Sequence, residues 1–213
     1  MRPQAVERIS ALFCNDGDRM PRPTVLKAST YRRMPWKNGG GETVEIAVSP
    51  EGAGLSEFDW RISMATVATD GPFSIFPGID RTLSILDGNG MSLEIDGSAP
   101  VLLTVTSEPL AFAADVVVSA SLAEGTITDL NVMTRRGRMK HQVDRVEVDG
   151  SAGVRVDAHT WLALCHRGSV VLEWERGKVE LGQGDSVLLE GALSTAVALS
   201  GQALVYLISI GNA

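Results

Sequence analysis

The chain has 213 residues, of which 44% are hydrophobic, and a formal net charge of −7. This composition fits a globular protein with a packed core, and the acidic balance argues against a nucleic-acid partner, because phosphate binding needs a concentrated basic surface. No apolar run approaches the about 18 residues of a membrane span, and residues 1–20 have no apolar signal-type segment, so we expect a cytoplasmic protein with no membrane partner.

Short runs of β-branched residues between turn signals dominate the chain from Pro23 onward. The first patterned strand covers residues 24–28, and later runs are separated by turns such as Asp-Gly-Asn-Gly at 87–90. Only residues 4–13 show a helical pattern. We therefore predict an all-β fold, preceded by an N-terminal extension, residues 1–22, whose order the sequence leaves open.

The stretch 34–48 places a Trp, a Lys and an Asn before consecutive glycines and an alternating strand. Glycines let backbone N–H groups approach a bound molecule closely, and the alternation puts Val44, Ile46 and Val48 on one face of the strand. We interpret the loop as a ligand-binding wall; the alternative is a flexible loop whose Trp packs on the core. The candidate binding residues here are Trp36, Lys37, Asn38, Gly39, Gly40, Thr43 and Glu45.

Residues 60–67 alternate in the same way, with apolar side chains on one face and Arg61 and Ser63 on the other. If the apolar face packs against a second layer, Arg61 and Ser63 point into a barrel, where an unpaired guanidinium is costly. Arg61 is therefore either half of a buried salt bridge, with Glu45 as its candidate partner, or a ligand contact. Both Arg61 and Ser63 are candidate binding residues.

An aromatic and proline-rich loop, residues 70–80, leads to Arg81 at the start of the next strand. Phe73 and Phe76 could form an apolar lid, with Ser74 offering a hydroxyl, or could only fill the mouth of a barrel. Arg81 is a candidate partner for a carboxylate, since guanidinium groups bind carboxylates in a bidentate manner. Phe76 and Arg81 join the candidate binding residues.

One face of residues 129–135 carries Asn131, Met133 and Arg135. An amide, a thioether and a guanidinium on one face suit a small polar ligand. Asn131 and Met133 complete the set of candidate binding residues.

Residues 83–97 and 162–177 share one plan: an apolar strand, a glycine turn, an alternating strand and a polar turn. The second copy continues into a Gly-Asp turn and a buried strand, an order that resembles that of cupins. Two copies predict a bicupin, with two jelly-roll-like β-barrels in one chain; a single β-sandwich is the alternative. We place a first barrel with the ligand pocket at residues 23–140 and a second, largely structural barrel at 141–213, with chain ends that can cross between them.

The histidines argue against a metal cofactor. Many cupins bind a metal through two closely spaced His, a Glu and a later His, but this chain has only His141, His159 and His166, with no neighbouring Glu that completes a set. We interpret His159 and His166 as surface or turn residues and predict no metal and no other cofactor. No catalytic residue is selected, and Cys165 is expected to pack in the core.

Four motifs resemble the HutD/Ves family of bacteria, and the resemblance extends from residue 24 to about residue 210. It implies a bicupin fold without a catalytic metal. It also implies an association with histidine utilisation, through binding of a pathway intermediate such as N-formylglutamate or urocanate and restraint of pathway expression. The motifs are Met-Pro-Trp-Lys-Asn-Gly-Gly-Gly-Glu-Thr at 34–43, Trp-Arg-Ile-Ser-Met-Ala at 60–65, Asp-Gly-Pro-Phe-Ser-Ile-Phe-Pro-Gly-Ile-Asp-Arg at 70–81 and Asp-Leu-Asn-Val-Met-Thr-Arg-Arg-Gly at 129–137.

Together these observations favour a binding protein over an enzyme. In the first reading, a metal-independent protein senses a small carboxylate metabolite, with Arg61 and Arg81 pairing with carboxylates. In the alternative, a metal-free cupin enzyme applies acid–base chemistry to such a carboxylate, with Glu45 or Glu42 as the base and Lys37 as an electrophilic partner. The sequence leaves open a scaffold role and a homodimer.

Overall fold

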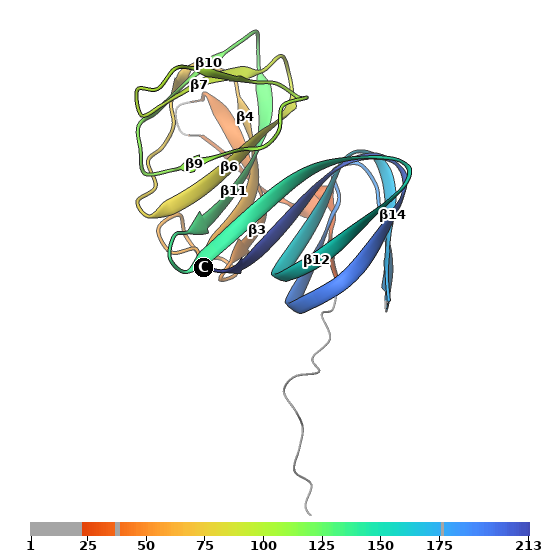
Figure 1. Ribbon diagram of the computed structural model, residues 1–213. Helices are drawn as coiled ribbons and strands as arrows, with labels where there is room; N and C mark the ends of the chain where they lie inside the picture. The colour runs from red at the N-terminus through yellow and green to blue at the C-terminus, as the bar shows by residue number, and fades with distance from the viewer. Residues whose placement is uncertain (1–22, 37–38, 176) are drawn as a thin grey trace, which may run out of the picture.

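The computed structural model describes residues 23–36, 39–175 and 177–213, and these form three antiparallel β-sheets (Figure 1). The all-β prediction is confirmed: the described residues contain a short 3-10 helix, η1 (Ala28–Thr30), and no α-helix. None of them forms a helix long and apolar enough to cross a membrane. The predicted extension at residues 1–22, with its helical pattern, lies outside the described residues.

A six-stranded sheet, in the order β2-β3-β4-β11-β6-β9, packs between the other two sheets. It consists of β2 (Arg32–Pro35), β3 (Gly41–Ser49), β4 (Trp60–Val67), β6 (Ile79–Asp87), β9 (Leu110–Ala113) and β11 (Ile127–Arg135). The sheet on one side has the order β5-β10-β7-β8 and consists of β5 (Gly71–Pro72), β7 (Met91–Ile95), β8 (Val101–Leu103) and β10 (Val118–Leu122). The sheet on the other side has the order β1-β14-β12-β13 and consists of β1 (Thr24–Leu26), β12 (Met139–Trp174), β13 (Gly177–Leu181) and β14 (Ser186–Asn212).

The alternation of β4 decides which side chains enter which layer. Ile62 packs with Tyr206 and other residues of β12 and β14, whereas Val67 packs with Leu93 and other residues of the β5-β10-β7-β8 sheet. Burial of apolar surface, at roughly 25 cal/mol per Å², holds both interfaces together. Arg61 lies on the same face as Val67, and the predicted sorting of residues 60–67 is confirmed.

A β-bulge in β3 overturns one part of the predicted alternation. The register with β4 shifts between Glu45 and Ala47, and such an insertion exchanges the two faces of a strand beyond it. Ala47 therefore packs in the core against β12 and β14, whereas Val48 packs beside Met133 on the opposite face. The prediction that Val48 shares the face of the earlier apolar residues of its strand is wrong.

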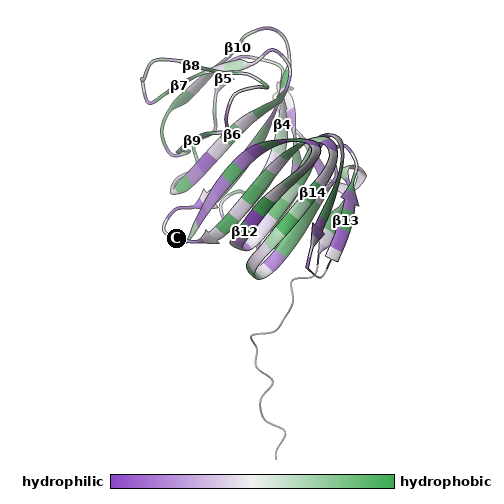
Figure 2. Cartoon of the chain, turned by 45° about the vertical axis from the view of Figure 1, so that its right-hand side comes forward, coloured by the Kyte–Doolittle hydropathy of each residue, from purple (hydrophilic) through white to green (hydrophobic). Residues whose placement is uncertain are grey.

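The strands β12 and β14 form a long two-stranded ribbon that coils on itself. Residues 139–158 pair with residues 193–212, and residues 160–174 pair again with residues 197–210. Hydrophobic and hydrophilic residues occur in turn along both strands, as the colours of Figure 2 show. The buried apolar side chains pack in the core of the ribbon. Cys165 is fully buried in this core, as predicted.

The first strand of the chain belongs to the sheet formed by its last part. Residues 24–26 pair with residues 186–188, so the first described strand lies beside β14; a crossing of chain ends between two barrels stays a prediction. The division into barrels at residues 23–140 and 141–213, and the bicupin itself, stay predictions.

Candidate functional site

A cavity of about 740 Å³ lies on the face of the six-stranded sheet that faces the β5-β10-β7-β8 sheet. Residues of β2, β3, β4, β6, β10 and β11 line it, together with loop residues 53–55 and with residues 69–74, which include β5. The charged residues of its described lining are Arg32, Glu45, Arg61, Asp70, Arg81 and Asp129.

Most of the predicted binding residues meet in this cavity. Gly39 and Gly40 are not among the described residues that line it, and Lys37 and Asn38 lie outside the described residues. A role in ligand binding stays a prediction for every residue selected from the sequence, inside the cavity or not. The predicted residues found in the lining are Trp36, Thr43, Glu45, Arg61, Ser63, Phe76, Arg81, Asn131 and Met133.

Arg61 is held in a buried ion pair. Its Nε lies 2.7 Å from Glu45 Oε2, and its Nη1 donates to Ser63 Oγ at 3.3 Å. The register of β3 and β4 places Glu45 directly opposite Ser63, which brings the two charges together. Of the two alternatives left open by the sequence, the salt bridge is present, although Arg61 also lines the cavity. Arg32, at the rim, lies 3.8 Å from Glu45.

Arg81 is buried in the same cavity without a carboxylate partner among the described residues. It is 6% exposed, and its Nε has no hydrogen-bond partner in the described part of the chain. Its guanidinium carbon lies 5.2, 5.3 and 5.9 Å from the ring centres of Phe73, Phe76 and Phe112, and its Nη2 lies 3.9 Å from Met133 Sδ. Burial lowers the pKa of Arg81 to about 10, so the guanidinium is charged at neutral pH.

Asp129 is a buried carboxyl group in the cavity that the sequence analysis did not select. It is 1% exposed and accepts hydrogen bonds from Asn131 Nδ2, at 2.5 Å, and from the backbone of Ala65. Burial raises the pKa of Asp129 to about 7, although Arg81 and these hydrogen bonds lower it. The signal that could have found Asp129 is its position two residues before Asn131, which puts both on one face of β11.

Trp36 is fixed against the strand that follows the glycine loop. Its Nε1 donates to Thr43 Oγ1 at 2.8 Å, and its backbone N–H donates to Gly41 O at 2.9 Å. A Cβ at Gly41 would collide with Thr66 O and would lie 3.0 Å from the Trp36 ring, so close packing requires glycine there. Trp36 both packs on the core and lines the cavity, which combines the two interpretations of this loop.

Arg135 does not join Asn131 and Met133 in the cavity. Its guanidinium donates to the carbonyl oxygens of Ser56 and Phe58 and lies 5.9 Å from the ring centre of Phe58. This end of β11 contacts the loop before β4, which draws the side chain away. The prediction that the Arg135 guanidinium shares a ligand-facing surface with Asn131 and Met133 is therefore wrong. Arg81 of the neighbouring strand β6 supplies a guanidinium to the cavity instead.

Two of the three histidines are not surface residues. His166 is buried and pairs with a backbone carbonyl of β6 at 2.9 Å. His141 is half-buried and bridges Thr82 Oγ1, at 2.8 Å, and Thr134 Oγ1, at 2.6 Å. Burial lowers the pKa of both, to about 4 for His141. The surface or turn interpretation is right for His159, which is exposed, and wrong for His166, which is buried in β12.

No group of three or more His, Cys, Asp or Glu side chains that could hold a metal occurs in the part of the chain that the structure describes.

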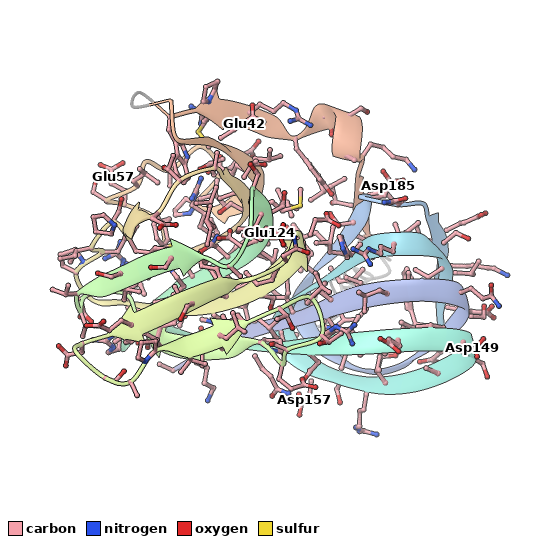
Figure 3. The ribbon with its side chains drawn as sticks, turned by 90° about the horizontal axis from the view of Figure 1, so that it is seen from above. Glu42, Glu57, Glu124, Asp149, Asp157 and Asp185 are labelled. Carbon is pink, nitrogen blue, oxygen red and sulfur yellow. The ribbon has the colours of Figure 1, made fainter. Side chains whose placement is uncertain are left out.

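Acidic side chains outside the cavity lie on both parts of the molecule. Glu42, one of the two predicted bases, pairs with Arg33 at 2.8 Å and is not among the described residues that line the cavity. The negative charge is thus spread over the surface, and attraction for an anion must come from the cavity itself. Figure 3 labels Glu42, Glu57 and Glu124 on the part that contains β3 to β11, and Asp149, Asp157 and Asp185 on the part that contains β12 to β14.

Known proteins resemble this chain over most of its length. The HutD family model matches residues 28–207. An uncharacterized 21.2 kDa protein in the hutC 3' region of Pseudomonas putida is 36% identical over 175 residues, which cover 81% of this chain and 89% of that protein. Protein Ves of Citrobacter koseri is 39% identical over 154 residues, which cover 68% and 73%. The structure of HutD from Pseudomonas fluorescens, obtained in a formate condition, superposes with a TM-score of 0.77 at 33% identity, covering 90% of this chain and all of that one.

A more distant structure shares the fold alone. Salicylate 1,2-dioxygenase from Pseudoaminobacter salicylatoxidans superposes with a TM-score of 0.60 at 7% identity, covering 92% of this chain and 83% of that one. This likeness supports a cupin-like β fold. The four sequence motifs therefore indicated the correct family, and the chain belongs to the HutD/Ves family.

Proposed function

We propose that this protein is a metal-independent binding protein that senses a small carboxylate intermediate of histidine degradation, such as N-formylglutamate or urocanate, and modulates histidine utilisation. The observation that carries the proposal is Arg81, a buried guanidinium in the cavity with no carboxylate partner among the described residues. Metal independence rests on the sequence, whose histidines lack the spacing of a cupin metal site.

A buried cation of this kind favours an anionic ligand. Removing a charge from water costs free energy unless a counter-charge compensates it. The rings of Phe73, Phe76 and Phe112 offset part of this cost, at about 0.5–2 kcal/mol for each cation–π contact, but they carry no net charge. A ligand carboxylate would supply both the charge and the acceptor atoms for the guanidinium N–H groups, including the unpaired Nε–H.

The rest of the lining suits a ligand with a second polar end. Glu45 pairs with Arg61 and also lies 3.8 Å from Arg32. Of the lining guanidinium groups, Arg81 is therefore the one without a carboxylate partner among the described residues, and Arg32, whose side chain is 67% exposed, lies at the rim. A dicarboxylate would place one carboxylate at each, with its apolar part near Trp36. Such contacts suit a micromolar dissociation constant, about −8 kcal/mol.

The relatives support this setting. The Pseudomonas putida relative is described by its position in the hutC 3' region, and the HutD structure of Pseudomonas fluorescens was obtained in a formate condition. Formate is the smallest carboxylate. We further propose that the three sheets form the two barrels of a bicupin, with the ligand cavity in the first, and that the protein acts in the cytoplasm.

A thermal-shift screen followed by calorimetry tests the proposal. The screen covers histidine, urocanate, formiminoglutamate, N-formylglutamate, glutamate and formate, since a ligand that binds only the folded state raises Tm. The affinity of the ligand found is then measured for Arg81→Met and for a matched control, Arg135→Met, which removes a guanidinium stacked on a Phe ring outside the cavity. We expect binding to weaken by about ten- to a hundredfold for the first variant and to be unchanged for the second. A flat screen, or unchanged affinity in Arg81→Met, would overturn the proposal.

Asp129 favours a second candidate function, a metal-free cupin enzyme acting on a small carboxylate by acid–base chemistry. A carboxyl group with a pKa of about 7 can accept and release a proton near neutral pH. This observation moves the candidate base from Glu45, which is paired with Arg61, to Asp129. Turnover of one of the six compounds that disappears in Asp129→Asn would support the enzyme, and no turnover of any of them would end this alternative.

A further inference from the structure

Asp129 and Arg81 are buried opposite charges that line one cavity, yet no ion pair joins them. Each still acts on the other: Arg81 lowers the pKa of Asp129, and Asp129 raises the pKa of Arg81. Asp129, on β11, and Arg81, on β6, therefore face the same cavity but do not form an ion pair across it. A ligand that reaches Arg81 enters the field of Asp129.

Burial raises the pKa of Asp129, and Arg81 is the cation that acts against this rise. Glu45 and Arg61 neutralise each other in an ion pair, and among the described residues the hydrogen-bond donors to Asp129 are the uncharged Asn131 amide and Ala65 backbone. The other charged side chains of the described lining are Arg32 from β2, Glu45 from β3, Arg61 from β4, Asp70 from the loop before β5, and Arg81 from β6; β5 and β10 also line the cavity but supply no charged side chain to it.

An anion bound at Arg81 would change the balance at Asp129. The negative charge of the anion would cancel the attraction of Arg81 for the Asp129 carboxylate and would also repel that carboxylate. A filled cavity would hold less water, which disfavours the charged form of a buried carboxyl group further. The neutral form of Asp129 would then be favoured in the complex.

We propose that the cavity takes up a small carboxylate together with one proton, with the anion on the Arg81 guanidinium and the proton on the Asp129 carboxyl group. The proton comes from solvent and returns to solvent on release, so that the cationic guanidinium and the anionic ligand balance each other beside a neutral acid. This inference rests on the proposed function, because it needs a carboxylate at Arg81. It makes the affinity of the site depend on pH.

Calorimetry with formate between pH 6 and pH 9 tests the proton uptake. Formate is ionised throughout this range, so a pH dependence reports a group of the protein. Above the pKa of free Asp129, about 7, we expect the affinity to fall by up to about tenfold per pH unit. The difference between binding enthalpies in phosphate and in Tris buffer at pH 8 should correspond to uptake of about one proton per bound formate.

Two variants identify the group that takes the proton. Asp129→Asn keeps a polar side chain of the same shape but cannot be protonated, so its formate affinity should not change with pH and no proton should be taken up. Glu42→Gln removes a carboxylate that pairs with Arg33 and is not among the described residues that line the cavity, and should keep both effects. Formate binding by the unmodified protein without proton uptake, or with an affinity that rises with pH, would overturn this inference alone. If neither formate nor any other compound of the thermal-shift screen bound, the proposed function would be overturned as well.

Discussion

Arg61 and Arg81 lie opposite the same residue, Met133, on the two strands that flank β11, but among the described residues only Arg61 has a carboxylate partner. Glu45 neutralises Arg61, whereas aromatic rings surround the guanidinium of Arg81. Two arginines on the strands that flank β11 therefore lie in different electrostatic environments. Substitutions near each of them should have different effects.

Glu45→Gln should destabilise the protein, because it leaves the buried guanidinium of Arg61 without its counter-charge. Breaking a buried ion pair by removing one partner costs about 3–5 kcal/mol, and we expect the free energy of unfolding in urea to fall by an amount near the lower end of that range. Glu42→Gln changes a glutamate of the same strand, β3, and breaks its exposed pair with Arg33 of β2; it serves as the control and should cost less than about 1 kcal/mol. Equal losses in the two variants would contradict the importance of burial.

Asp129→Asn should stabilise the unliganded protein, and more at pH 8 than at pH 5. The pKa of Asp129 is about 7 in the folded protein but about 3.9 in an unfolded chain. As the pH rises from about 3.9 to about 7, Asp129 loses its proton in the unfolded chain before it does so in the folded protein. The contribution of this group to stability is therefore greatest below about pH 4 and falls as the pH rises to about 7. Thermal melts of both proteins at pH 5 and pH 8 check this expectation, which fails if the difference in Tm is the same at both.

Alternation predicted the strand faces of the site well. A period of two places Arg61 and Ser63 on one face and Ile62 on the other, whatever partner strands they find, and the structure has this arrangement. The bulge after Glu45 could not be predicted in this way, because it adds a residue without a marked sequence signal. Val48 therefore lies on the face opposite to the one expected.

Apart from the Glu45 partner of Arg61, the partners brought from other strands were not revealed by the sequence. The pKa of Asp129 depends on burial and on Arg81 of β6, and His141 is held by threonines of β6 and β11. Arg135 contacts a loop that lies more than 70 positions earlier in the chain. Such contacts depend on the order of strands in the sheet, which a single strand pattern does not contain.

His141→Ala should destabilise the protein near neutral pH. The change leaves the fully buried hydroxyl of Thr134 without its partner, at a cost of about 1–3 kcal/mol. The pKa of His141 is about 4 in the folded protein and about 6.5 in an unfolded chain, so the stability contributed by the neutral ring is full above about pH 6.5 and is lost as the pH falls to 4.

The free energies of unfolding of the two proteins should therefore approach each other between pH 7 and pH 5. His159→Ala changes an exposed histidine of the same chain and should alter stability by less than about 0.5 kcal/mol at either pH. A gap between His141→Ala and the unmodified protein that widens toward pH 5 would contradict the burial of a neutral ring.

Gly41→Ala should disturb the wall that Trp36 forms. The added Cβ would meet the backbone oxygen of Thr66 and would lie 3.0 Å from the Trp36 ring. A clash with backbone cannot be relieved by rotating a side chain, so either the pairing of β3 with β4 or the position of the indole must change, at a cost of about 1–3 kcal/mol. Gly153→Ala is the matched control, because it is also a strand glycine but a Cβ there meets nothing within 4 Å. Thermal melts and ligand titrations should show loss of both stability and affinity in Gly41→Ala alone; a stable variant with weakened binding would mean that the indole, and not the sheet, moves.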